Sequence, residues 1–123
     1  MLKDDFFKIL KEQYGEGSRI FLLEINKGHS IFEGHFKGTP IVPGACLVQM
    51  AIEVFNFAIQ KEYQLKKVKN IKFLNIVQPV ENALLEMEIR CKETENQAGK
   101  GISVIIRHDE TCYGKMDLEL SVE

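Results

Sequence analysis

A short segment, residues 34–44 with the sequence GHFKGTPIVPG, surrounds one titratable side chain with residues that free or restrict the backbone. His35 has an unperturbed pKa of about 6.5, so it can take up and release protons near neutral pH. Three glycines and two prolines accompany it, and the longest apolar run of the chain follows directly. We therefore expect a reactive histidine on a rigid loop that leads into the start of a buried helix.

The predicted helix covers residues 44–62 and places backbone chemistry beside the loop. Pro43 suits a helix start, because its missing N–H would be unpaired there anyway. Unpaired amides at the start of a helix favour negative charge, and glycine at position 44 lets a ligand approach the backbone closely. The helix is apolar in nearly every direction, which is typical of a buried helix. Its polar residues form one narrow stripe, at Gln49, Glu53, Asn56 and Gln60.

The rest of the chain alternates with a period of two, which indicates strands. Residues 4–14 fit either a helical face or the first arm of a hairpin that turns at GEGS. Further strands are predicted at 18–26, 66–76, 83–92, 102–106 and 112–122. An antiparallel sheet must cover its apolar face, so we predict an α+β fold in which the sheet wraps the central helix. An exposed edge of such a sheet invites pairing with a second copy.

Composition narrows the functional classes. A length of 123 residues indicates one domain, residues 1–123, and a net charge of −2 gives no global attraction to nucleic acid or acidic membranes. Charges at residues 3–5 argue against a secretory signal, and polar residues interrupt the apolar run 41–59, so no membrane span is expected. The three cysteines show no metal-ligand spacing, which favours reduced thiols in a cytoplasmic protein.

The segment 34–44 resembles the motif of the 3-hydroxyacyl-acyl carrier protein dehydratases of the hotdog-fold superfamily. That pattern is roughly G-H-F-x-G-x-P-x-x-P-G, and all seven of its fixed positions match, at Gly34, His35, Phe36, Gly38, Pro40, Pro43 and Gly44. The resemblance implies a hotdog fold with one long central helix, and by analogy with shorter relatives it favours a strand at residues 7–14. It extends more loosely to IKFLNIVQP at 71–79 and to the final hairpin.

The resemblance also implies roles for particular residues. His35 would take the proton next to the thioester carbonyl, and the N–H of Gly44 would stabilise charge on the carbonyl oxygen. Phe36, Pro43 and Ala45 would contact substrate. No metal or redox cofactor is implied, because the phosphopantetheine arm arrives with the acyl carrier protein.

The resemblance further implies an assembly. A homodimer, or a higher oligomer of dimers, would form two shared sites in which His35 of one subunit faces Gln49 of the other. The acyl chain would occupy an apolar tunnel beside the central helix.

The sequence departs from the family pattern at Gln49, where an acidic residue is usual. A carboxamide cannot act as a general acid, and losing such help typically costs about 10²–10⁴ in rate. His35 could perform both proton transfers, or Glu53 or Glu33 could substitute as the acid. Alternatively, the chain is a weak or inactive member that binds acyl chains or joins a glutamate-bearing homologue in a hetero-oligomer. An acyl thioesterase on the same fold is a further alternative.

A few other residues allow two interpretations. Lysines at 66, 67, 69 and 72 could dock an acidic carrier protein or could be a solvated strand end. Cys46, near the helix start, could be a stabilised thiolate or a small buried residue. His29 and His108 lie in turn-like segments, and we assign them no role.

Overall fold

The computed structural model describes residues 1–34, 40–79, 83–92 and 99–122. Within these ranges the chain forms one long helix, one short helix and six strands. In chain order they are β1 (Phe7–Gly15), β2 (Ser18–Ile25), α1 (Ile31–Gly34), α2 (Gly44–Ile59), β3 (Gln64–Phe73), β4 (Leu84–Lys92), β5 (Gly99–His108) and β6 (Thr111–Ser121).

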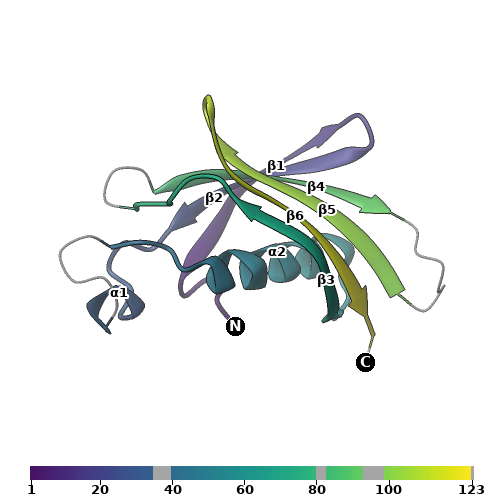
Figure 1. The fold of residues 1–123 in the computed structure, drawn as a ribbon, viewed down its shortest axis with the longest axis horizontal. Helices are drawn as coiled ribbons and strands as arrows, with labels where there is room; N and C mark the ends of the chain where they lie inside the picture. The colour runs from purple at the N-terminus through teal and green to yellow at the C-terminus, as the bar shows by residue number, and fades with distance from the viewer. Residues whose placement is uncertain (35–39, 80–82, 93–98, 123) are drawn as a thin grey trace.

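The six strands form a single sheet in the order β1-β2-β4-β5-β6-β3, and every neighbouring pair is antiparallel. The sheet curves over α2, which lies along its concave face (Figure 1). β1 and β3 are the two edges of the sheet, and α1 lies beyond one end of α2. This arrangement is the α+β hotdog fold that the sequence predicts.

The helix α2 begins at the predicted residue but ends three residues early. Gln60 adopts a left-handed conformation with φ 58° and ψ 45°, and its N–H donates to the carbonyl of Asn56. The Asn56 side chain then brackets Tyr63, donating to its carbonyl and accepting from its N–H, each at 3.0 Å. These bonds replace the next helical turn, so the chain leaves α2 toward β3.

The strand predictions hold with shifted ends. Residues 7–14 belong to a strand, as the resemblance favoured, and the predicted turn falls at Gly17, whose φ is +70°. β3 begins two residues before the predicted strand 66–76 and ends three residues before the end of that prediction. β5 begins at Gly99, three residues before the predicted strand 102–106. Residues 93–98 lie outside the described residues. The short helix α1 was not predicted.

The core fills the space between α2 and the concave face of the sheet. Alternate residues of β4 and β6 point into it, as the period-two pattern predicts, whereas Cys91 and Val122 at the strand ends are exposed. The core residues contributed by α2 and these two strands are Leu47, Met50, Ala51, Ile52, Val54, Phe55, Leu85, Met87, Ile89, Met116, Leu118 and Leu120. In the part of the chain that is described, no helix is long and apolar enough to cross a membrane.

Candidate active site

The N-terminus of α2 has no side-chain cap. Pro43 is the N-cap residue, with an extended backbone at φ −61° and ψ 145°, rather than the first helical residue. Its carbonyl accepts hydrogen bonds from the N–H groups of Cys46 and Leu47, at 3.0 and 3.2 Å. No described residue accepts a hydrogen bond from Gly44 or Ala45 N–H. Two amides at the positive end of a 16-residue helix are therefore available to an anionic or carbonyl oxygen.

The chain before α2 is held in place by the segment that follows β3. The N–H of Val42 donates to the carbonyl of Val77 at 2.9 Å, and both side chains are buried. This contact fixes the approach of residues 40–43 to the helix. The motif residues His35, Phe36 and Gly38 lie outside the described residues, so their roles stay predictions.

Gly44 lies in close contact with a side chain of β3. A Cβ at this position would lie 2.8 Å from Cε2 and Cζ of Phe73, the last residue of β3. A Cβ at Gly114 would also approach the Phe73 ring, at 3.5 Å, and would meet the Lys72 carbonyl at 2.9 Å. Phe73 thus lies against two glycines, yet 50% of its surface remains exposed. No local sequence pattern indicates that Phe73 is a neighbour of the site, although a glycine in the motif is compatible with a close contact.

Gln49 is exposed and donates from Nε2 to Oε2 of Glu53 at 2.8 Å, one turn further along α2. A carboxylate accepts hydrogen bonds but donates none, so the amide nitrogen of Gln49 must face Glu53. The amide oxygen Oε1 is then left to accept from a ligand. Gln49 can hold a hydroxyl group, but it has no acidic proton to deliver.

Glu53 is buried, with 6% of its surface exposed, and its carboxylate binds the N-terminal segment. The backbone N–H of Leu2 lies 2.9 Å from both carboxylate oxygens, and the N–H of Lys3 lies 2.7 Å from Oε1. With Gln49, three groups donate to this one side chain. The arrangement favours an anchoring role for Glu53 over the role of alternative acid.

The other predicted candidates are dispersed. Glu33 is exposed on α1, and among the described residues it makes no hydrogen bond or ion pair with Gln49 or Gly44. His29 has a structural environment: its Nε2 lies 3.0 Å from Oδ2 of Asp5, and its Nδ1 accepts from the N–H of Ile31.

Cys46 is half-buried, and burial raises the pKa of its thiol, which opposes the thiolate interpretation. In the described ranges, no three His, Cys, Asp or Glu side chains group in a way that could hold a metal ion.

The polar stripe of α2 lines a groove of about 1050 Å³ along the outer side of the helix. All four of its residues contribute to the lining: Gln49, Glu53, Asn56 and Gln60. Ala45 lies at the end of the groove near the helix start, and exposed apolar side chains border it at Phe57, Leu65 and Val122. A ligand held at the N-terminus of α2 could therefore contact Gln49 from this groove.

Comparison with known protein sequences identifies similarity to dehydratases. The family model described as ApeI-like, ApeI dehydratase, matches residues 11–104 of the chain. The 3-hydroxyacyl-[acyl-carrier-protein] dehydratase FabZ of Clostridium acetobutylicum is 35% identical over 82 residues. That match covers 61% of this chain and 58% of the enzyme, so the chain spans less than two thirds of its relative.

Solved structures share the fold. The dehydratase heterocomplex ApeI:P from Xenorhabdus doucetiae superposes with a TM-score of 0.69 at 14% identity, covering 92% of this chain and 96% of that one. A hypothetical thioesterase with coenzyme A from Streptococcus pneumoniae TIGR4 gives a TM-score of 0.65 at 12% identity, covering 95% and 85%. At such identities the likeness shows the hotdog fold alone. The family match covers most of the sequence, and the chain therefore belongs to the ApeI-like dehydratase family.

Proposed function

We propose that this protein catalyses the reversible dehydration of a 3-hydroxyacyl thioester to a trans-2-enoyl thioester. One observation carries the proposal: the histidine-containing segment 34–44 leads directly into an uncapped helix start, in a chain of a dehydratase family. The free amides of Gly44 and Ala45 suit the carbonyl oxygen of a thioester. Gln49, just over one turn further on, suits the substrate hydroxyl.

The chemistry needs one proton to move from carbon 2 to the leaving hydroxyl. His35 removes that proton, and the electron pair shifts toward the thioester carbonyl, whose oxygen accepts from the Gly44 N–H. The C3–O bond then breaks, and His35 returns the proton to the departing oxygen, so that water leaves. We assign both transfers to His35 because Gln49 has no acidic proton and the Glu53 carboxylate is engaged by Leu2, Lys3 and Gln49.

The acyl group would be carried by an acyl carrier protein, whose phosphopantetheine arm brings the thioester to the site. Supporting this part of the proposal, Lys66, Lys67, Lys69 and Lys72 are exposed on β3, although Lys69 also pairs with Glu119 at 3.3 Å. Opposite charge would guide the encounter with an acidic carrier. The role would fall in fatty-acid or related acyl-chain synthesis.

A second subunit would complete each site. β3 is an edge strand that exposes the apolar residues Leu65, Val68 and Phe73, and such an edge favours pairing with another copy. In a homodimer, Gln49 of one subunit would face His35 of the other. A glutamate-bearing homologue could take the second place instead, and the structural likeness to a dehydratase heterocomplex makes this the alternative to test.

The experiment follows two products at once. Purified protein is incubated with 3-hydroxyacyl thioesters of several chain lengths, on both acyl carrier protein and a small thiol, while enoyl product and free thiol are measured. We expect enoyl product that falls by at least about 10²-fold in His35→Ala. His108→Ala is the matched control, since His108 lies at the β5–β6 turn beside Asp109, and it should retain activity.

Each other outcome points to a different function. Free thiol without enoyl product would identify an acyl thioesterase. No product from any thioester would contradict both enzymes and indicate a binding or accessory subunit. In that case, co-purification with a glutamate-bearing homologue, and activity of the pair, would identify the hetero-oligomer.

A further inference from the structure

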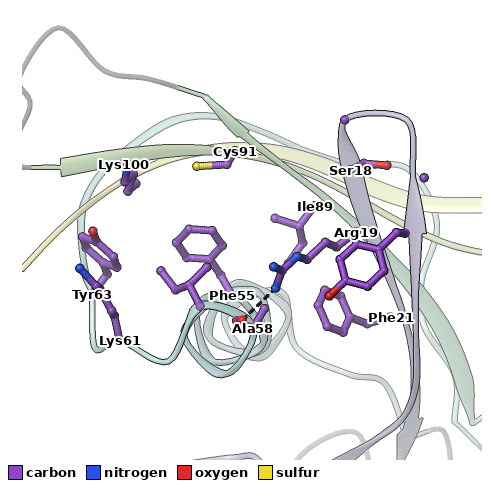
Figure 2. Close-up of a pocket in the computed structure, with 14 residues that line it drawn as sticks. Ser18, Arg19, Phe21, Phe55, Ala58, Lys61, Tyr63, Ile89, Cys91 and Lys100 are labelled. Atoms are coloured by element: carbon purple, nitrogen blue, oxygen red, sulfur yellow. Dashed lines mark hydrogen bonds between the residues drawn. The ribbon is translucent and has the colours of Figure 1, made fainter.

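A second cavity, of about 530 Å³, lies at the opposite end of α2 from the candidate active site. It is bordered by the last turn of α2, the β1–β2 hairpin and the adjoining ends of β4 and β5 (Figure 2). Its volume is within the range of about 300–1,000 Å³ that is typical of small-molecule sites. The lining residues are Tyr14, Gly15, Gly17, Ser18, Arg19, Phe21, Phe55, Ala58, Ile59, Lys61, Tyr63, Ile89, Cys91 and Lys100.

This cavity is separate from the candidate active site. It meets α2 at residues 55–59, whereas the active-site proposal uses the helix between Gly44 and Gln49. At about 1.5 Å per residue, roughly 20 Å of helix lies between Gly44 and Ala58. Gly44, Ala45 and Gln49, the described residues proposed for dehydration, do not line the cavity. It borders only the far end of the groove along α2, with which it shares Lys61 and Tyr63.

The body of the cavity is apolar. Phe21, Phe55 and Ile89 are core residues at its wall, from β2, α2 and β4 respectively. Ile59 and the small side chain of Ala58 continue this wall along the helix. An alkyl chain would gain free energy by leaving water for such a wall.

Among the described residues that line the cavity, all charges are of one sign. Arg19, Lys61 and Lys100 line it, and no described Asp or Glu does, although acidic residues outnumber basic ones in the chain by 18 to 16. The neighbours in sequence, Glu16 and Glu62, are not part of the lining. An anionic group is therefore the charge complement of this site.

The three cations are not equivalent. Arg19 donates from Nη1 to the carbonyl of Ala58 at 2.8 Å, and Nη1 lies 3.5 Å from a carboxylate oxygen of Glu12. Its guanidinium group is therefore already bound to the C-terminal end of α2. Lys61 and Lys100 form no ion pair with any described residue. Figure 2 shows both lysines with Tyr63 on one side of the cavity, away from the Arg19–Ala58 bond.

We propose that this cavity binds a fatty carboxylate. The carboxylate would lie between Lys61 and Lys100, within reach of the Tyr63 ring edge, and the alkyl chain would extend over Phe55 toward Phe21. The two ammonium groups, which form no ion pair within the described ranges, favour an anion at that side of the cavity. The carbonyl end of α2 repels an anion at the other side. The proposal does not depend on the dehydration chemistry, because it uses different residues.

Calorimetric titration of the purified full chain tests the ligand class. The probes are hexanoate, octanoate and decanoate, each below its micelle concentration, with the 1-alkanols of equal length as uncharged matches. We expect each added methylene to tighten binding by up to about fourfold. The alkanols should bind at least tenfold more weakly than the carboxylates. Equal affinities for alkanol and carboxylate would overturn the proposal.

Variants test the residues. The double variant Lys61→Gln, Lys100→Gln should weaken decanoate binding at least tenfold and leave decanol binding within twofold. Lys66→Gln, Lys67→Gln is the matched control, since both of those lysines are exposed on β3 outside the cavity, and it should bind decanoate as the native chain does. Equal decanoate affinity in the two double variants would contradict the assignment.

The cysteines locate the bound ligand. Cys91 is exposed and lines the cavity, whereas Cys46 and Cys112 do not line it. Saturating decanoate should slow the alkylation of Cys91 by iodoacetamide at least fivefold and leave the alkylation rate of Cys112 unchanged. Peptide mass spectrometry measures both rates. An unprotected Cys91 would overturn the proposal. Cys46 lies in the first turn of α2, so its alkylation rate reports on binding near the candidate active site. The two cysteines therefore distinguish a ligand in the cavity from a ligand near that site.

Discussion

At the scale of single residues, the hydrogen bond between Gln49 and Glu53 decides how the departure from the family pattern can be tested. The carboxylate of Glu53 accepts a hydrogen bond of 2.8 Å from Gln49 Nε2, and Glu53 is buried. Restoring an acid by Gln49→Glu would place two carboxylates against each other. Like charges at this distance oppose ionisation of both groups and destabilise the fold. Gln49→Glu alone therefore supplies a general acid but also removes the hydrogen bond between residues 49 and 53.

We expect the exchange variant Gln49→Glu, Glu53→Gln to dehydrate a 3-hydroxyacyl thioester faster than the native chain at neutral pH. The glutamine at position 53 would donate to the new carboxyl group and still accept from the N–H of Leu2 or Lys3. The gain should be on the order of 10²-fold in kcat/KM, the lower range for general acid catalysis. Steady-state rates and thermal unfolding of both variants provide the measurement.

The single variant Gln49→Glu serves as the comparison. It should unfold at a lower temperature than the exchange variant and show a smaller gain in rate. A slower exchange variant with an unchanged fold would mean that the Gln49 amide serves catalysis directly.

At the scale of elements, Glu53 joins the N-terminal segment to α2. It binds the backbone N–H groups of Leu2 and Lys3, which lie about 50 residues away in the sequence. Glu53→Ala should cost about 2–3 kcal/mol in the free energy of unfolding, because charged hydrogen bonds are lost and partly buried donors are left unpaired. Urea denaturation measures this cost. Glu62→Ala, at an exposed position beyond α2, should change stability by less than about 0.5 kcal/mol.

If Glu53→Ala kept the native stability and lowered only the dehydration rate, the anchoring role would be wrong. Glu53 would then be a candidate acid again.

A second element-level contact joins three strands of the sheet through Glu88 of β4. Its carboxylate accepts from Arg107 of β5 at 2.8 Å and from Ser18 of β2 at 2.7 Å. Both bonds favour the ionised form, so the pKa of Glu88 lies below its ordinary value of 4.5, against an opposing effect of burial. On β6, hydrogen bonds from Ser103 and Lys92 likewise lower the pKa of Asp117 below its ordinary 3.8.

These lowered pKa values predict acid sensitivity. The unfolded chain binds protons at higher pH than the folded chain, so stability is present above the ordinary values and is lost as pH falls. We expect the free energy of unfolding to be nearly constant from pH 7 to 5.5 as far as these groups are concerned, and to fall below about pH 4.5. Glu88→Gln should flatten that fall, whereas Glu110→Gln in the exposed β5–β6 turn should not. The midpoints of urea denaturation of the native chain and of both variants, at several pH values, measure this difference.

At the scale of the whole molecule, the two edges of the sheet differ. β3 presents Leu65 beside the groove along α2, together with exposed Val68. β1 at the other edge exposes Leu10 and Tyr14, which do not line that groove. Apolar surface that continues from an edge strand onto a helix groove is typical of an interface. This asymmetry supports pairing of two copies through β3.

We expect Leu65→Lys to weaken self-association at least about tenfold, because a charge would be buried at the interface without a partner. Sedimentation equilibrium over a concentration series measures the change. Leu10→Lys on β1 is the matched control and should sediment as the native chain does. If both variants associate equally well, β3 is not the interface.

Much of the fold follows from the sequence because local patterns encode it. The alternation at 83–92 and 112–122 predicts the inward faces of β4 and β6, and the apolar residues after Pro43 predict α2. The end of α2 could not be predicted in this way. Residues 60–62 remain compatible with a helix locally, and only the contact of Asn56 with Tyr63 ends it.

The sequence by itself determined the fold class, the family and the chemical types at the site, because the motif 34–44 and the periodic apolar residues are local in the chain. Only the tertiary structure decided which side chains are available for chemistry. Gln49 and Glu53 both lie on the polar stripe of α2, and the sequence does not distinguish their environments. In the structure Leu2 and Lys3 contact Glu53, which is buried, whereas Gln49 is exposed. The cavity beside Lys61 and Lys100 is likewise built from residues far apart in the chain, and no local pattern carries such a contact.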